Sequence, residues 1–175
     1  AGPIVVADMA DNPGGGARGD SSFALQAVLS FGIPNVALGG LWDPGAVQLC
    51  FEAGLGSTLA LRVAGKSGPT SGSPVDLSVT VRALAENHEQ SAFGDKSPLG
   101  ASAWVSTAEG IDMVLISRCQ QVIGADLFTG LGVDLSGKHA VVVKSMQHFH
   151  AAFAPLAREV LYADSPGLLT ADIAG

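Results

Sequence analysis

The chain has 175 residues, enough for one sizeable hydrophobic core and few for two. Apolar residues make up 47% of it and charged residues only 14%, so much of the chain is expected to be buried. The formal net charge of −7 argues against nucleic-acid binding, which requires a basic surface, and no apolar run is long enough to span a membrane.

Low charge together with 23 glycines predicts that part of the surface contacts another domain, or a second copy in a homo-oligomer. Cys50 and Cys119 are isolated and form no zinc or disulfide pattern, which predicts a reduced, cytoplasmic protein. Residues 1–3 lead directly into a strand of the buried type, as at the excised end of a longer chain.

The first predicted element is Ile4–Ala7, an apolar run without alternation, as expected for a strand covered on both faces. A glycine-rich loop follows, and Asp20 or Ser21 can then N-cap a helix that ends near Gly32. Proteins of the α/β class place ligand-facing backbone where a buried strand enters such a loop and then a helix. We therefore expect this loop to line any catalytic or binding site of the chain.

Val36–Leu38 predicts a second buried strand, and Asp43 followed by Pro44 is a strong helix start. Ser57–Val63 alternates between apolar and polar residues and predicts a third strand. The order β-α-β-α-β predicts that the first part of the sheet is parallel and belongs to a three-layer fold.

The pattern then changes to an antiparallel type. Leu77–Ala83 alternates as in a half-buried strand. The polar segment Glu86–Pro98 predicts a loop or a long hairpin tip, in which His88 is expected to be solvated. Ala101–Thr107 and Ile111–Ser117 predict a strand pair joined by a short turn.

The end returns to an α/β pattern. Gly124–Leu131 predicts a short helix or turn, Ala140–Val143 a buried strand, and Val160–Tyr162 a last strand. A helix is expected to begin near Met146. Its core-facing stripe comprises Met146, Phe149, Phe153 and Leu156. The predicted fold is a single three-layer α/β domain over residues 1–175 with a mixed sheet, parallel β-α-β units at both ends and an antiparallel middle section.

The consecutive glycines Gly14, Gly15 and Gly16 could hold an anion on their backbone N–H groups and the following helix dipole. The alternative is a tight turn that lets loop and sheet approach closely. The loop has neither the G-K-[S/T] of a Walker loop nor the G-x-G-x-x-G spacing of dinucleotide-binding proteins. We favour a ligand-lining role over turn geometry alone, with phosphate binding well behind.

Asp8, Asp11 and Asp20 could together hold a metal, but a strand-end carboxylate, an Asx turn and an N-cap are common roles for aspartate. Arg18 can simply neutralise them, and no histidine is nearby in sequence. We therefore expect no metal site in this loop.

A second group follows the strand Ala140–Val143. On a helix, His148 and His150 would point in nearly opposite directions, with His150 buried or at the core boundary and His148 better placed for function, close to Lys144 and Ser145. Ser145 lacks the context of a nucleophile elbow, so no Ser–His–Asp triad can be assembled.

The two strand-to-helix loops are expected to emerge at one edge of the sheet, because parallel strands place their carboxyl ends together. If their strands are neighbours or one strand apart, Lys144 or His148 can approach Asp8 or Asp11 and relieve the repulsion between the carboxylates.

Four segments resemble the C-terminal region of the microcystinase C (MlrC-like) metallopeptidase family. They are A-D-x-x-D-N-P-G-G-G-A-x-G-D at Ala7–Asp20, W-D-P at 42–44, V-K-S-x-Q-H-F-x-A-A-F at Val143–Phe153, and the D-S-P-G within Val160–Gly167. The resemblance implies a zinc-dependent peptidase, a hydrolase of small, often linearised peptides. It also implies that zinc and catalytic residues belong to an N-terminal region absent from this chain, whose partners are then that N-terminal domain and the peptide substrate.

No catalytic or metal-binding residue is assigned within this chain, and whether it is an enzyme by itself stays open. The residues expected to line an active site are Asp8, Asp11, Asn12, Gly14, Gly15, Gly16, Arg18, Asp20, Lys144, Ser145 and His148. Two hypotheses remain: a C-terminal domain that completes the peptidase's substrate cleft, or an autonomous, non-catalytic module that binds a small anion through the glycine-rich loop.

Overall fold

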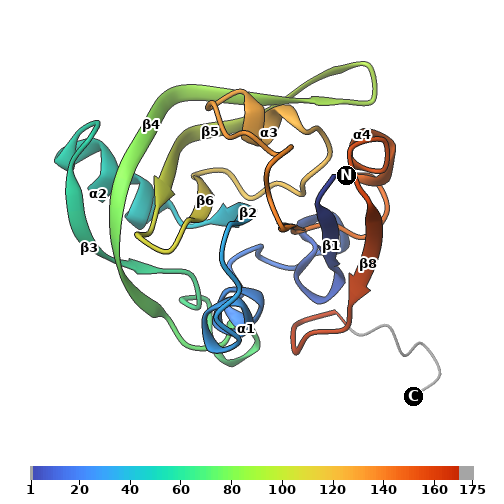
Figure 1. Cartoon of the computed structure of the whole chain (residues 1–175), viewed down its shortest axis with the longest axis horizontal. Coiled ribbons are helices and arrows are strands. Elements are labelled where there is room, and N and C mark those ends of the chain that lie inside the picture. The colour runs from blue at the N-terminus through green and yellow to red at the C-terminus, as the bar shows by residue number, and fades with distance from the viewer. Residues whose placement is uncertain (1, 170–175) are drawn as a thin grey trace.

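The computed structural model describes residues 2–169, which form one eight-stranded sheet in the order β3-β4-β5-β6-β2-β7-β1-β8, flanked by short helices (Figure 1). The strands are β1 (Ile4–Asp8), β2 (Val36–Trp42), β3 (Thr58–Val63), β4 (Val75–Ala92), β5 (Asp95–Ser106), β6 (Ile111–Ile116), β7 (Ala140–Val143) and β8 (Glu159–Ala163). The helices are α1 (Phe23–Ser30), α2 (Pro44–Ala53), α3 (Asp126–Thr129) and α4 (His150–Phe153), with 3-10 turns η1 (Met9–Asp11), η2 (Pro13–Gly15) and η3 (Pro69–Ser71).

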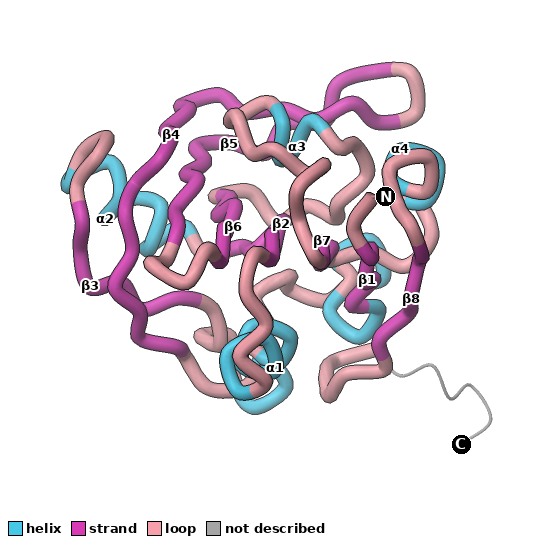
Figure 2. The backbone as a smooth tube through the Cα atoms, in the orientation of Figure 1, coloured by secondary structure: helices cyan, strands magenta, loops and turns pink. Residues whose placement is uncertain are grey.

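The sheet is mixed, as predicted. β1 pairs in parallel with β7 and β8, and β2 pairs in parallel with β6 and β7. The pairs β3–β4, β4–β5 and β5–β6 are antiparallel. Figure 2 shows the short parallel strands at the centre and the long β4–β5 hairpin curving around them.

The expected parallel β-α-β-α-β beginning is wrong at its third strand, because β3 lies at the edge of the sheet and pairs antiparallel with β4. Exposed Thr58 and Arg62 alternate with buried Leu61 and Val63 in β3, a pattern that suits a half-solvated antiparallel edge. β2 pairs with neither β1 nor β3, because its two neighbours in the sheet are β6 and β7.

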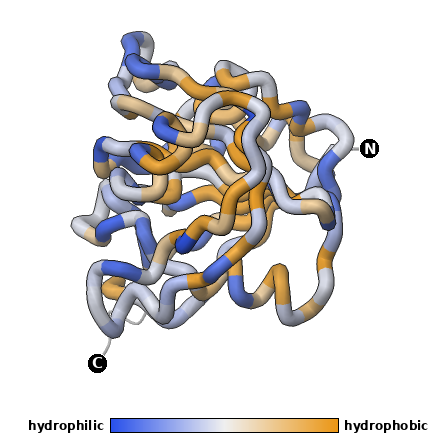
Figure 3. The backbone as a smooth tube through the Cα atoms, turned by 90° about the vertical axis from the view of Figure 1, so that its left-hand side faces the viewer, coloured by the Kyte–Doolittle hydropathy of each residue, from blue (hydrophilic) through white to orange (hydrophobic). Residues whose placement is uncertain are grey.

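Two apolar clusters fill the two faces of the sheet, which gives three layers. α1 and α2 pack on one face through residues such as Leu25 and Val47, and α3 and α4 on the other through Phe128 and Phe153. Hydrophobic segments lie inside, between more polar surface loops (Figure 3). Gly39 in β2 allows α3 to pack closely, because a Cβ atom there would overlap the Phe128 ring.

The segment Glu86–Pro98 belongs to the long β4–β5 hairpin, whose arm packs against α3. The expectation that His88 is solvated is wrong, since its side chain is buried and its Nε2 lies 2.9 Å from the Leu127 carbonyl oxygen. Exposed Asn87 and Glu89 alternate with buried His88 and Gln90, and Gln90 bonds to the segment just before α3, so a polar composition did not mean exposure.

The helix expected from Met146 is much shorter: α4 comprises only His150–Phe153 and is preceded by turns. Phe149 and Phe153 are buried as predicted, but Leu156 is exposed. His150 is exposed as well, although it was expected to be buried or at the core boundary. Pro155 cannot donate a backbone hydrogen bond, which limits helix extension toward Leu156. Within residues 2–169, no helix has the length and apolarity needed to cross a membrane.

Candidate functional site at the carboxyl edge of the sheet

The β1–β7 register brings the two motif loops together. Ala7 pairs with Val143, so the next residues, Asp8 and Lys144, leave the sheet side by side. Lys144 Nζ lies 2.7 Å from Asp8 Oδ2 and 2.9 Å from Asp11 Oδ2. The prediction that Lys144 or His148 approaches these carboxylates is confirmed for Lys144. We call Asp8, Asp11 and Lys144 the Lys144 hub.

The hub is buried and its ammonium group is fully paired. Besides the two carboxylates, Lys144 Nζ donates to the Ser21 carbonyl oxygen at 2.8 Å. An ammonium has three N–H donors, and here each has an acceptor, so Lys144 is held in one position between the sheet and the start of α1. This arrangement suits a positioning role rather than proton transfer.

Asp11 closes the glycine-rich loop at its base. Its Oδ1 accepts a hydrogen bond from Gly19 N at 2.9 Å, and its Oδ2 accepts one from Ser21 N at 2.7 Å. Burial raises the pKa of the Asp11 carboxyl, while the nearby Lys144 ammonium opposes this shift. The loop conformation therefore depends on the Asp11 carboxylate, which joins the start of the loop to its end.

The amides of the consecutive glycines are used inside the loop. Gly14 N donates to Asn12 Oδ1, Gly15 N to the Asn12 carbonyl oxygen and Gly16 N to the Pro13 carbonyl oxygen, each at 3.0 Å. These bonds form η2, and the three donors are not free for an anion in this conformation. The contacts favour the turn interpretation of these glycines over an anion cradle, although Gly14, Gly15 and Gly16 are exposed and let another molecule approach the backbone.

The sequence suggested Asp20 or Ser21 as the N-cap of α1, and this is wrong. Ser22 occupies the N-cap position and makes no side-chain cap hydrogen bond. Asp20 instead accepts hydrogen bonds from Lys66 N, Ser67 N and Ser71 Oγ. It anchors the loop before β4, a partner nearly fifty residues away that local sequence could not reveal. Asp43 does cap α2, accepting from Ala46 N at 3.1 Å.

Two further predicted residues lie on the β7–α4 loop. Ser145 Oγ is buried and, within residues 2–169, has no hydrogen-bond partner. His148 is exposed and away from the hub's carboxylate contacts, with its Nδ1 3.2 Å from Gln121 Oε1 and its ring edge-on to Phe93 at 4.9 Å between centroids. Gln121 also lies against Gly14, so its half-buried side chain lies between Gly14 and His148.

Sequence reasoning missed two residues of this edge. Ser165 Oγ donates to Asp8 Oδ1 at 2.6 Å and so satisfies the second carboxylate oxygen. The D-S-P-G motif that contains Ser165 was a signal for its importance, but not for its partner. Gln121 lies in an irregular segment between β6 and α3 that carries no recognisable pattern.

The hub does not fit a metal ion. Its carboxylate oxygens already accept bonds from Lys144, Ser165 and backbone N–H groups, and the ammonium would repel a cation. No group of three or more His, Cys, Asp or Glu side chains with the geometry of a metal site occurs among the described residues. Cys119 donates its thiol to the Arg18 carbonyl oxygen at 3.3 Å, and burial raises its pKa, so it is not an activated nucleophile.

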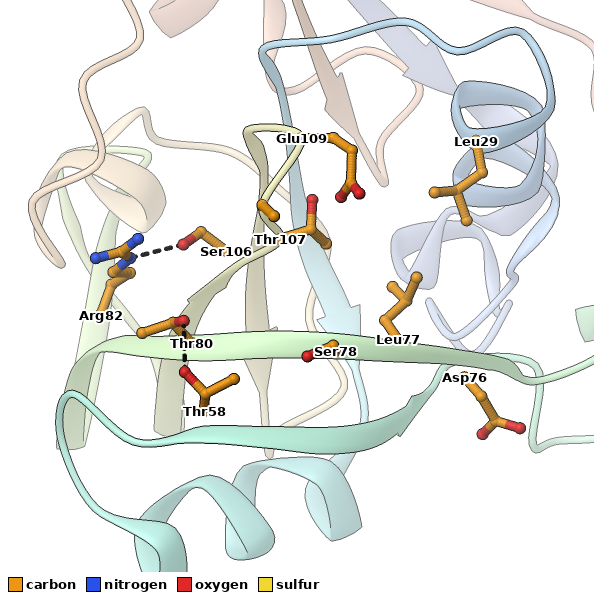
Figure 4. A pocket seen from close by; sticks show the side chains of 11 residues that line it. Leu29, Thr58, Asp76, Leu77, Ser78, Thr80, Arg82, Ser106, Thr107 and Glu109 are labelled. Atoms are coloured by element: carbon orange, nitrogen blue, oxygen red, sulfur yellow. Dashed lines mark hydrogen bonds between the residues drawn. The ribbon is translucent and has the colours of Figure 1, made fainter.

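A separate hollow of about 320 Å³ lies beside β3, β4 and the β5–β6 turn (Figure 4). Its polar groups largely satisfy one another: Arg82 Nε donates to Ser106 Oγ at 2.6 Å, and the hydroxyls of Thr58 and Thr80 are 3.0 Å apart. It contains none of the predicted site residues, so the carboxyl edge is the better candidate.

Comparisons with known proteins identify the family of this chain. The family model described as "MlrC C-terminus" matches residues 6–175. The chain is 42% identical over 163 residues to Microcystinase C of a Sphingomonas species, an alignment that covers 93% of this chain and 32% of that protein. A crystal structure described as that of a putative metallopeptidase from Mesorhizobium sp. BNC1 matches with a TM-score of 0.86 and 26% identity over 97% of this chain and 34% of the other.

The chain thus spans about a third of the length of these two relatives. The family model covers both motif loops that the Lys144 hub joins, together with the closing segment that supplies Ser165. The chain belongs to the MlrC C-terminus family.

Proposed function

We propose that this chain is the C-terminal domain of a longer zinc-dependent peptidase, and that its carboxyl edge completes a cleft for small or linearised peptides. Family membership and the names of the two relatives support a peptidase. Because the hub does not fit a metal, the zinc ligands belong to the N-terminal part of the longer polypeptide. The proposal includes a cytoplasmic location, with which the free thiols of Cys50 and Cys119 agree.

One observation carries the cleft role: Lys144 joins the two family-motif loops through buried ionic contacts. In this proposal the predicted site residues divide into two sets. The buried residues Asp8, Asp11, Asn12, Asp20, Lys144 and Ser145 position the loops. The exposed residues Gly14, Gly15, Gly16, Arg18 and His148 contact the peptide.

Arg18 is the group best suited to bind a peptide carboxylate. Its guanidinium lies 5.9 Å from the centroid of the Trp42 ring, which orients it while leaving its N–H donors accessible. Guanidinium groups bind carboxylates through paired hydrogen bonds. When bound in the longer protein, zinc would supply an activated water; Arg18 would hold the peptide's anionic end and the glycines would admit its backbone.

The test uses the full-length protein with linear peptides that carry either a free or an amidated C-terminus. Arg18→Ala should lower kcat/KM for the free acid by about tenfold, the effect of losing a partly exposed charge-assisted bond, and change the amide little. Arg62→Ala removes another exposed arginine, at the antiparallel edge of the sheet, and is the control.

Equal losses for the two peptides, or an equal effect of Arg62→Ala, would contradict the assigned role of Arg18. A full-length protein that hydrolyses no small peptide after zinc is supplied would contradict the proposed function itself.

A further inference from the structure

Strand β1 has a sequence for burial on both faces, but one of its faces is only partly covered. It lies between the parallel strands β7 and β8, and parallel strands inside a sheet are normally covered on both sides. Val5 and Ala7 are fully buried on the α4 face, whereas Ile4 and Val6, which point to the opposite face, are half-buried. Within residues 2–169, α1 forms one wall of the hollow beside Val6, whereas the hollow that reaches Leu161 on β8 is lined by no helix residue.

The open face forms one continuous depression. Hollows of about 820 and 420 Å³ adjoin, since Val6, Ile33 and Ala140 line both. We call this surface the β1 trough and define it by Ile4, Val6, Ile33, Ala140 and Leu161. These side chains are aliphatic, so leaving them in water would be unfavourable, at a scale of roughly 25 cal/mol per Å².

The two ends of the β1 trough are informative. Gly2, just before β1, lines one end. Ser165 and Pro166 line the other end, and Ser165 donates to Asp8 of the Lys144 hub. The trough therefore runs along β1 from the start of the chain to the candidate site. Five strand residues span roughly 17 Å, the length of a helix of about eleven residues.

We propose that the β1 trough holds an amphipathic helix of about three turns from the part of the longer polypeptide that precedes this region. Proteins similar to this chain have about two-thirds of their length outside the matching region, which is their C-terminal part. The preceding segment would join at Gly2, at the mouth of the trough, so its local concentration there is high. The inference rests on the proposed function only in requiring a longer polypeptide.

Charge defines the helix further. Arg158 lines the end of the trough near Gly2, and no acidic side chain among residues 2–169 pairs with it. Lys138, at the same end, is already paired with Asp112. The occupying helix therefore carries an aliphatic stripe toward β1 and an acidic residue near Arg158. Seated there, it fixes the N-terminal part of the protein relative to the Lys144 hub.

Thiol labelling of the full-length protein tests this without any assay of activity. In a Cys119→Ser background, Leu161→Cys places a thiol in the trough, and Leu49→Cys places one on α2 as the control. The two leucines are similarly exposed in this structure, at 43% and 47%. We expect a maleimide to label the Leu161→Cys variant at least about tenfold more slowly than the Leu49→Cys variant, at concentrations where the protein is monomeric. Ile33→Cys, on the other wall of the trough, should be protected to the same degree.

Equal labelling rates at both trough positions and at position 49 would overturn the proposal. So would protection that disappears on dilution, which would identify a second copy as the occupant. Protection that disappears when the full-length protein is ended at Leu169 would assign the trough to residues 170–175 and overturn it as well.

Discussion

Two ion pairs in the two halves of the sheet have similar chemistry and opposite surroundings. In the parallel half, Lys144 meets Asp8 and Asp11, and its side chain is 2% exposed. At the antiparallel edge, Arg62 on β3 meets Asp76 on β4 through two bonds of 2.7 Å, and its side chain is 65% exposed. The exposed pair has the more regular, bidentate geometry, yet water can replace each partner at little cost. Burial, rather than geometry, is therefore expected to decide how much stability is lost when one partner is removed.

A third pair lies between these extremes. Lys66 is 37% exposed and contacts both oxygens of the buried Asp43 at 2.8 Å. Asp43 also accepts hydrogen bonds from the backbone N–H groups of Ala46 and Ala64, so it keeps partners if Lys66 is lost. The three pairs form a series in which the effect of removing the cation should fall as its exposure rises.

The largest effect is expected for Lys144→Met, which keeps the apolar stem and removes the charge. It leaves two buried carboxylates without their cation and should lower the free energy of unfolding by about 3–5 kcal/mol, measured by urea denaturation. The double variant Asp8→Asn/Lys144→Met should recover part of this loss, because it removes one of the unpaired charges. A loss below about 1 kcal/mol for the single variant would contradict this expectation, since it would mean that burial does not determine the stability lost with the cation.

A smaller effect is expected for Lys66→Met. Asp43 retains two backbone donors, so the free energy of unfolding should fall by only about 1 kcal/mol in the same measurement. A loss as large as that of Lys144→Met would show that partial exposure of the cation does not reduce the stability lost on its removal. The order of the series would then be wrong.

Asp126 extends the comparison to pH. Burial opposes its ionisation, but hydrogen bonds from Ser91 and Lys96 outweigh burial and lower the pKa of this carboxyl below its ordinary value. A carboxyl with a lowered pKa in the folded state contributes stability above its unfolded pKa of about 4, and this contribution is lost as pH falls further. The stability difference between the wild type and Asp126→Asn should therefore be largest near neutral pH and shrink below about pH 4. A stability difference that stays constant from pH 7 to pH 3 would show that the charge of Asp126 does not contribute to stability.

The smallest effect is expected for Arg62→Ala. The pair is exposed to solvent on both sides, so thermal unfolding should change little, and any change should vanish at high salt. The pKa of Asp76, which hydrogen bonding to Arg62 lowers, should return toward its ordinary value in this variant, as measured by NMR titration. A marked loss of stability that persists at high salt would show that bidentate geometry matters more than burial.

Much of the local structure followed from the sequence. The unbroken apolar runs predicted β1, β2 and β7, and Asp43 with Pro44 predicted the start of α2. The strand-to-helix pattern of both motif loops also predicted that they share the carboxyl edge. The strands and the helix start depend on near neighbours in the chain, where apolar periodicity and capping residues act directly. The shared edge followed from the general rule that parallel strands place their carboxyl ends together.

Only the tertiary structure decided which distant groups meet. β7 lies between β1 and β2, and this placement brings Lys144 to Asp8 across 136 residues of sequence. Packing of the β4–β5 arm on α3 buried His88 in a segment that composition alone marked as solvated, and Asp20 found its partners in the loop before β4 rather than at the start of α1. Periodicity records whether a residue faces the core, but many pairings satisfy the same pattern. The choice among them depends on how the whole sheet and its helices pack, which no local stretch of sequence contains.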